Sequence, residues 1–184
     1  MKTQSIKVFL AGLLATVSLL GSGMASAATV QTTGVLNDIA TGILNLDIGG
    51  TLYNVEFVET TPNDLYGFEQ PRTYDFDTEA AASGAMDAII GALNSHSTEI
   101  TSVGEVGNNE DRFYIGFADI LLSVNAVESE YDFGFDTWEN QGTNVINPDL
   151  VWFYADVQVV PIPAAVWLFG SALGLLAWVR RRAT

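Results

Sequence analysis

The stretch that decides the fold is residues 41–58, TGILNLDI-GG-TLYNVEFV, in which two β-prone runs flank Gly49-Gly50. A Gly-Gly pair permits the positive φ angles of a two-residue β-hairpin turn. The predicted pairs are Ile48 with Thr51, Leu46 with Tyr53, Leu44 with Val55 and Gly42 with Phe57. This register places the apolar side chains on one face, namely Leu44, Leu46, Tyr53, Val55 and Phe57. The polar ones share the other face, namely Asn45, Asp47, Asn54 and Glu56. Turn chemistry and side-chain alternation thus predict the same hairpin.

One amphipathic helix is predicted over residues 78–95, after a Pro-containing loop at 59–74. Asp77 is suited to be its N-cap, and Glu79 favours the positive end of the helix dipole. Gly84 and Gly91 lower the intrinsic helix propensity, so packing must hold the helix. Its apolar stripe is Ala82, Ala85, Met86, Ile89, Ile90 and Leu93.

Further strands follow this helix. Apolar alternation at 113–117 continues through 120–127, and residues 104–109 read as a turn before it. Residues 134–148 are rich in Asn and read as irregular, whereas 151–159 alternate as a final strand. A hairpin, one helix and several strands predict an α+β domain, an antiparallel sheet with one packed helix. The alternative is a β-sandwich that carries one helix.

The N-terminus has the three parts of a secretory signal peptide, residues 1–27. Lys2 and Lys7 supply the positive charge, and an apolar core follows them. Ala25 and Ala27 then form an A-x-A site for signal peptidase, which would leave Ala28 as the first mature residue. The sequence therefore predicts export.

The C-terminus, residues 160–184, ends in an apolar run at 164–179 followed by Arg180, Arg181 and Arg182. Sixteen helical residues span about 24 Å, slightly less than a hydrocarbon core of about 30 Å. Arginine side chains that reach the interface make up the difference. A transmembrane helix at 164–179 is predicted, with its basic end in the cytoplasm by the positive-inside rule.

This tail resembles the PEP-CTERM sorting signal of Gram-negative bacteria, which joins a Pro-Glu-Pro motif, a membrane helix and a basic cluster. Pro161 and Pro163 stand for the motif here, with Ile162 in place of Glu. The resemblance implies recognition by an exosortase, a membrane protease-transpeptidase, in bacteria that make exopolysaccharide. It implies an inner-membrane-anchored precursor and a mature protein at the cell surface or in the extracellular matrix.

The domain between the two signals, residues 28–159, is strongly acidic. It holds all 22 acidic residues but only Arg72 and Arg112 as basic ones, a net charge of −20. Nucleic acid is therefore excluded as an expected partner, because phosphate binding needs Lys and Arg. The chain has no cysteine, so packing or bound ions must stabilise the domain without disulfides.

Two acidic runs are candidate calcium ligands, because Ca²⁺ takes six to eight oxygen atoms. The first run is Asp75, Asp77 and Glu79; the second is Glu128, Glu130 and Asp132, which would share one face of a strand. Neither run fits the EF-hand loop. Helix caps and solvated edge charges are the favoured explanation of both.

Catalytic chemistry has little support in the sequence. His96, the single histidine, lies at the C-terminal end of the predicted helix. A histidine is favourable there because its positive form interacts with the negative end of the helix dipole. A catalytic base would need a nucleophile and an orienting carboxylate beside it. The sequence has no G-x-S-x-G, H-E-x-x-H, Walker or Rossmann motif. A carboxylate pair for glycoside hydrolysis could be assembled from so many acids, but any choice is arbitrary.

Several aromatic residues could stack on sugar rings, although the core is the favoured place for them. They are Tyr66, Phe68, Tyr74, Trp138 and Trp152, and Trp138 in the Asn-rich segment is the best placed of them. The expected function is a non-enzymatic exported protein with a structural or adhesive role. The alternative is a carbohydrate- or calcium-binding module in the polysaccharide matrix, and a secreted hydrolase is less favoured.

Overall fold

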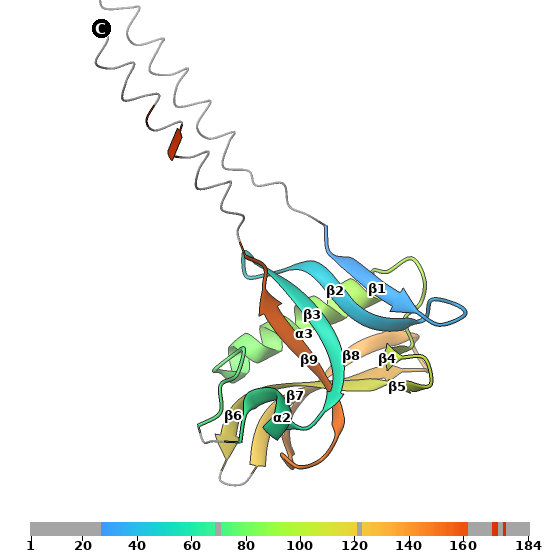
Figure 1. The fold of residues 1–184 in the computed structure, drawn as a ribbon. Helices are drawn as coiled ribbons and strands as arrows, with labels where there is room; N and C mark the ends of the chain where they lie inside the picture. The colour runs from blue at the N-terminus through green and yellow to red at the C-terminus, as the bar shows by residue number, and fades with distance from the viewer. Residues whose placement is uncertain (1–26, 69–70, 121–122, 162–170, 173–174, 176–184) are drawn as a thin grey trace, which may run out of the picture.

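A computed structural model describes residues 27–68, 71–120, 123–161, 171–172 and 175. Their main feature is one sheet, curled around a helix (Figure 1). The helices are α2 (Pro62–Tyr66) and α3 (Glu79–Asn94). The first strands are β1 (Thr29–Thr33), β2 (Ile39–Ile48), β3 (Thr51–Thr60), β4 (Ser102–Glu105) and β5 (Asn108–Glu110). The later strands are β6 (Arg112–Ile120), β7 (Ser123–Asp132), β8 (Thr137–Ile146) and β9 (Trp152–Val159).

The sheet has the strand order β5-β4-β2-β3-β9-β6-β7-β8. Strand β1 lies off this path and also pairs with β2. Its pairs are antiparallel except β2 with β4 and β6 with β9, which are parallel. Across the described ranges all the strands thus join one mostly antiparallel sheet. The predicted antiparallel sheet with a packed helix is confirmed at this level, and the described residues do not form the two facing sheets of a sandwich.

The long helix α3 begins and ends within one residue of its prediction. Its N-cap is Thr78, whose side chain accepts a hydrogen bond from the backbone N–H of Ala81 at 3.2 Å. The prediction of Asp77 as N-cap is therefore wrong by one position. Serine, threonine and aspartate all cap well, and the sequence offered two of them side by side.

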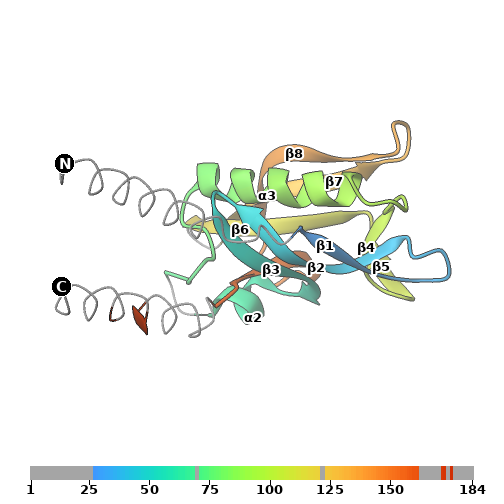
Figure 2. The ribbon, with the colours of Figure 1, turned by 90° about the horizontal axis from the view of Figure 1, so that it is seen from above.

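Helix α3 packs against the inner face of the sheet, and this contact forms the main core. It touches strands from both halves of the strand order, with β2 in one half and β8 in the other, so the sheet wraps around it (Figure 2). The buried residues of α3 are Ala82, Ala85, Met86, Ile89 and Leu93, which are five of the six predicted positions. Two of these five residues are alanines, and all five are at most 1% exposed, so the helix is closely packed on the strands.

The β2–β3 hairpin turns at Gly49-Gly50 as predicted, and the pairs of Ile48 with Thr51 and Leu46 with Tyr53 are confirmed. Beyond them the predicted register is wrong. A bulge between Ile43 and Leu46 shifts the pairing by one residue, so that Ile43 lies opposite Val55. Ile43 is fully buried in the core, where the prediction had placed Leu44.

Asn45 sits inside this bulge with a φ of 55°. A left-handed conformation is uncommon outside glycine, but asparagine tolerates it better than most residues. The side chain of Asn54 accepts a hydrogen bond from the Asn45 backbone N–H at 3.1 Å, which satisfies a donor that the ladder leaves out. The bulge therefore lets both halves of β2 bury apolar side chains on the same face.

Two further predictions need correction. The segment predicted as a loop at 59–74 extends β3 to Thr60 and contains α2, capped by Thr61, which accepts from the Asp64 N–H at 3.1 Å. The segment predicted as irregular at 134–148 is mostly β8, which pairs along β7. Strand β8 is the last in the order and mostly exposed, so it lacks the apolar alternation that reveals a strand in sequence.

The outer face of the sheet carries a second, smaller core under α2. Its buried members are Tyr66, Tyr114, Val124, Ala126, Ile146 and Tyr154. The hydroxyl of Tyr66 accepts a hydrogen bond from the Gly116 N–H at 3.1 Å, which ties α2 to β6. Helix α2 thus covers the outer face at β6 and β9, and α3 covers the inner face at β6.

Candidate functional site

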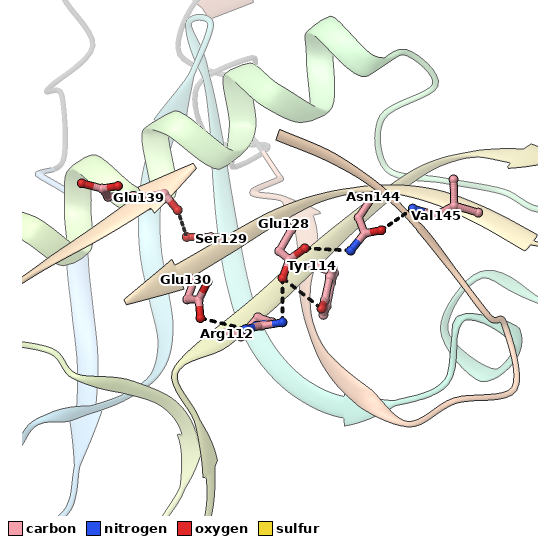
Figure 3. Close-up of polar contacts among 8 residues, drawn as sticks. All are labelled: Arg112, Tyr114, Glu128, Ser129, Glu130, Glu139, Asn144 and Val145. Atoms are coloured by element: carbon pink, nitrogen blue, oxygen red, sulfur yellow. Dashed lines mark hydrogen bonds and ion pairs between the residues drawn. The ribbon is translucent and has the colours of Figure 1, made fainter. Parts of the chain in front are cut away.

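A connected group of polar side chains lies on the outer face beside the second core, as Figure 3 shows. We call it the outer-face network: Arg112, Tyr114, Glu128, Glu130 and Asn144. The Arg112 guanidinium contacts Glu128 at 2.9 Å and Glu130 at 2.7 Å. Glu128 also accepts hydrogen bonds from the amide of Asn144 at 2.8 Å and the hydroxyl of Tyr114 at 3.3 Å. Every oxygen of Glu128 is thus engaged.

Strand register builds this network. Residue Arg112 of β6 lies opposite Glu130 of β7, and Tyr114 lies opposite Glu128. Alternation sends the intervening Ser129 to the other face, where its hydroxyl donates to the Glu139 carbonyl at 3.0 Å (Figure 3). The predicted placement of Glu128 and Glu130 on one strand face is therefore confirmed.

Charge within the network is held by mutual pairing. Glu128 is only 9% exposed, so its carboxylate needs the partners that surround it. Burial is the main reason that the pKa of the Tyr114 hydroxyl is raised, and its pairing with Glu128 adds to this. The pKa of Arg112 is also raised, first by Tyr114 and then by Glu130. At neutral pH the Arg112 guanidinium is therefore charged and the Tyr114 phenol is neutral.

An exposed tryptophan borders the network. Trp152 of β9 is 38% exposed and lies edge-on to Tyr114, with ring centroids 6.0 Å apart. Tyr114 in turn contacts Glu128, so a flat aromatic surface adjoins hydrogen-bonding groups. Sugar-binding sites need this combination, because the ring packs on the aromatic face while the hydroxyls meet polar side chains. The sequence predicted Trp152 as a stacking residue and the glutamates as calcium ligands, but it did not predict that they lie near each other.

The second predicted acidic run is only partly convergent. Glu128 and Glu130 meet at Arg112, but Asp132 turns to the β7–β8 turn and accepts from the Gly134 N–H at 2.6 Å. Arg112 was the missing partner in the prediction. It is one of only two basic residues within 28–159, a range that holds all 22 acidic residues, and that scarcity alone indicates a paired arginine.

The first predicted acidic run, Asp75, Asp77 and Glu79, diverges. Asp75 accepts from the Val157 N–H of β9 at 3.4 Å, whereas Glu79 accepts from the Thr143 hydroxyl of β8 at 2.9 Å. Strands β6 and β7 separate β9 from β8 in the sheet. Among the residues that the structure describes, no three Asp, Glu, His or Cys side chains gather as a metal site. Calcium binding stays a prediction.

His96 closes the turn after α3, where its Nδ1 lies 3.2 Å from the Thr98 N–H, which donates to it. It borders a hollow of about 520 Å³ together with Asp47 and Ser95. Each of these two side chains has its own local contact: Ser95 donates to the Gly91 carbonyl, and Asp47 accepts from the Gly50 N–H at 2.7 Å.

Most of the aromatic residues considered for sugar stacking are internal. Trp138 is 2% exposed, and its indole N–H donates to the Ile100 carbonyl at 2.7 Å. The choice of Trp138 as the best placed is therefore wrong, because its segment is a strand whose inner face meets the core. Tyr66 is buried and Tyr74 half-buried, whereas Phe68 and Trp152 are exposed.

The predicted signal peptide at 1–27 and the predicted sorting tail at 160–184 lie almost wholly outside the described residues. This holds for Ala25 of the signal peptide, and in the tail for Pro163, for Arg180 to Arg182 and for the run at 164–179 apart from residues 171–172 and 175. Ala27 and Pro161 are described and lie at the two ends of the domain. Among the described residues, no helix has the length and apolar character needed to cross a membrane.

Comparisons of the chain with protein-family models, with curated proteins and with solved structures give no match.

Proposed function

We propose that this chain is an exported, non-enzymatic protein with an adhesive or structural role outside the cell. Residues 1–27 direct export, and signal peptidase cuts after Ala27. The tail at 160–184 then holds the folded domain at the inner membrane. A sorting enzyme of the exosortase type processes this tail, and the mature protein stays at the cell surface or in the extracellular matrix.

The placement of the two domain ends supports this proposal. Thr29, at the start of β1, lies opposite Leu44 of β2, and Val159, at the end of β9, lies opposite Tyr53 of β3. Tyr53 itself lies opposite Leu46. Three strand spacings, about 14 Å, thus separate the ends on one side of the sheet. The chain enters and leaves the domain on the same side in Figures 1 and 2. A domain that is held at both ends before signal-peptide cleavage, and by its C-terminus alone afterwards, can have this geometry without distortion.

Deletion of Arg180, Arg181 and Arg182 tests the sorting step. We expect the variant to accumulate as an unprocessed precursor in the inner-membrane fraction, because the basic cluster is the last part of the signal. Deletion of Ala183 and Thr184 is the matched control and should leave processing intact. Unchanged mature size and location after loss of the arginines would refute the sorting proposal. N-terminal sequencing of the mature protein should begin at Ala28.

A second function is favoured by Trp152 and the outer-face network. We propose that they bind extracellular polysaccharide, with a sugar ring on the indole and its hydroxyls near Glu128 and Asn144. The exposed indole, set against a preorganised polar group, carries this proposal, since stacking surface and hydrogen bonds occur together.

Retention on immobilised matrix polysaccharide tests this function. Trp152→Ala should abolish retention, whereas Phe68→Ala, which removes another exposed aromatic, should not. A titration with millimolar calcium, followed by thermal melting, tests whether the domain binds calcium. If the wild-type protein is not retained and its melting temperature is unchanged by calcium, the proposal of a carbohydrate- or calcium-binding module is refuted.

A further inference from the structure

A second hollow lies on the outer face, away from the outer-face network. It has a volume of about 410 Å³ and spans β1, β2, β3 and β9. We call it the Gly42 groove. Its lining residues are Gln31, Thr41, Leu44, Asn54, Val55, Glu56, Asp156 and Gln158. Its volume falls in the range of small-molecule sites, and most of its side chains can form hydrogen bonds.

Strand register sets a straight row across this groove. Gln31 lies opposite Gly42, Gly42 opposite Glu56, and Glu56 opposite Asp156. The glycine leaves the middle of the row without a side chain. A Cβ at this position would lie 2.5 Å from the Val55 carbonyl oxygen, so the strand pairing itself requires glycine here. Gly42 itself is buried, so the hollow is bounded by the side chains on either side of the glycine, with Gln31 on one side and Glu56 and Asp156 on the other.

The carboxylates of the groove are electrostatically unbalanced. Glu56 and Asp156 are direct cross-strand neighbours, an arrangement that destabilises a sheet when both are charged. Among the described residues the ion pairs belong to Arg72 and Arg112, and none reaches this row. The partner of Asp156 is a neutral one, the side-chain amide of Gln158 at 2.8 Å.

A third carboxylate lies close by. Burial and then the charge of Asp156 raise the pKa of the Asp75 carboxyl, against the lowering effect of the hydrogen bond from Val157. The groove thus combines a carboxylate pair without a cation, several amide and hydroxyl groups, and the apolar side chain of Leu44.

We propose that the Gly42 groove binds an amino sugar, with the ammonium group of the ligand between Glu56 and Asp156. A cation there removes the repulsion between the two carboxylates and forms charge-assisted hydrogen bonds. The sugar hydroxyls meet the amides of Gln31 and Asn54, and the apolar face of the ring packs on Leu44. Uronic acid units are disfavoured by the same carboxylates. The groove shares no residue with the outer-face network, so this proposal holds or fails independently of Trp152 and of sorting.

Calorimetric titration of the full-length chain in non-ionic detergent tests the proposal, at a slightly acidic pH where the amine of the ligand is charged. The probes are a glucosamine oligomer, its N-acetylated counterpart, spermine and calcium chloride. We expect the glucosamine oligomer to bind at least about tenfold more tightly than the other three, since only it combines the charge with the hydroxyls.

Variants then locate the site. Glu56→Gln and Asp156→Asn keep side-chain size on an open surface, and each should weaken binding about tenfold. Glu105→Gln removes the same charge from the exposed last residue of β4 and is the matched control, expected to bind as the wild type does. Circular dichroism melting confirms that each variant is folded.

The proposal is overturned by equal binding of the N-acetylated oligomer, which would remove the role of the charge. Spermine that binds as tightly would indicate a general polycation surface, and calcium that binds more tightly would indicate a metal site. Absence of binding by all four probes, or undiminished binding by both groove variants, would also overturn it.

Discussion

Arg72 and Asp119 form a nearly buried ion pair, although 47 residues separate them in the chain. The Asp119 carboxylate also accepts from the Arg72 backbone N–H at 2.9 Å and from the Tyr74 hydroxyl at 2.8 Å. The side chain of Arg72 is 4% exposed and that of Asp119 is 16% exposed. This pair fastens the segment after α2 to the end of β6.

Asp119→Asn should therefore destabilise the protein by about 3 kcal/mol, because it leaves the buried Arg72 guanidinium without its counter-charge. Urea denaturation with a constant m-value measures this loss. Glu105→Gln, an exposed carboxylate of β4, should change the free energy of unfolding by less than about 0.5 kcal/mol. Equal stability of the Asp119 variant would mean that the pair contributes nothing.

The same pair predicts a particular response to acid. Burial alone would raise the pKa of Asp119, but the hydrogen bonds and charge of Arg72 and the bond from Tyr74 outweigh it, and the pKa is lowered. The carboxylate therefore stabilises the folded state above its unfolded pKa of about 3.9, and this contribution is lost as pH falls through the lower folded value. Between about pH 4 and pH 2 the wild type should lose stability more steeply than Asp119→Asn. Parallel curves from urea titrations would contradict this.

Asp75 should behave in the opposite way. Its raised pKa means that the folded state binds the proton more tightly than the unfolded state, so stability falls as pH rises above about 3.9. Asp75→Asn keeps an oxygen that can accept from the Val157 N–H and removes the repulsion by Asp156. We expect a higher melting temperature at pH 7 and a smaller gain at pH 4. Asp77→Asn, two residues away and exposed, should show no such gain.

Gly116 is a position where size decides stability. A Cβ there would lie 2.7 Å from Cε2 of Tyr66 and 3.1 Å from Cε1 of Tyr74. Gly116→Ala should cost about 2 kcal/mol by overpacking. The control is Gly84→Ala on α3, where a Cβ meets nothing within 4 Å and where alanine should add about 0.5–1 kcal/mol through helix propensity. Thermal melting of both variants would show changes of opposite sign, and a stabilised Gly116 variant would refute the packing argument.

Local signals were enough to predict the elements that have strong local chemistry. Gly49-Gly50 dictates its turn, and the stripe of α3 predicts its inner face. The register of the whole hairpin could not be predicted, because the bulge at Asn45 depends on a side chain from the neighbouring strand, Asn54. A single bulged residue reverses which of Ile43 and Leu44 is buried.

The candidate sites were harder to predict because they are assembled across strands. Glu128 and Glu130 were placed on one face by alternation, but the cation between them comes from β6 and the amide from β8. Strand β8 has a polar sequence, and its pairing with β7 defines it rather than its own pattern. Trp138 was misplaced for the same reason.

The position of β9 gives the domain a mechanical property. Strand β9 is the last strand, yet it lies inside the sheet, paired with β3 from Tyr53 to Thr60 and flanked by β6 on its other side. Its antiparallel hydrogen bonds run perpendicular to the strand. A pull on the chain beyond Val159, directed along the strand, loads these bonds together in shear instead of opening them one after another. A domain that adheres at one face and is held by its C-terminus would therefore resist being stretched apart.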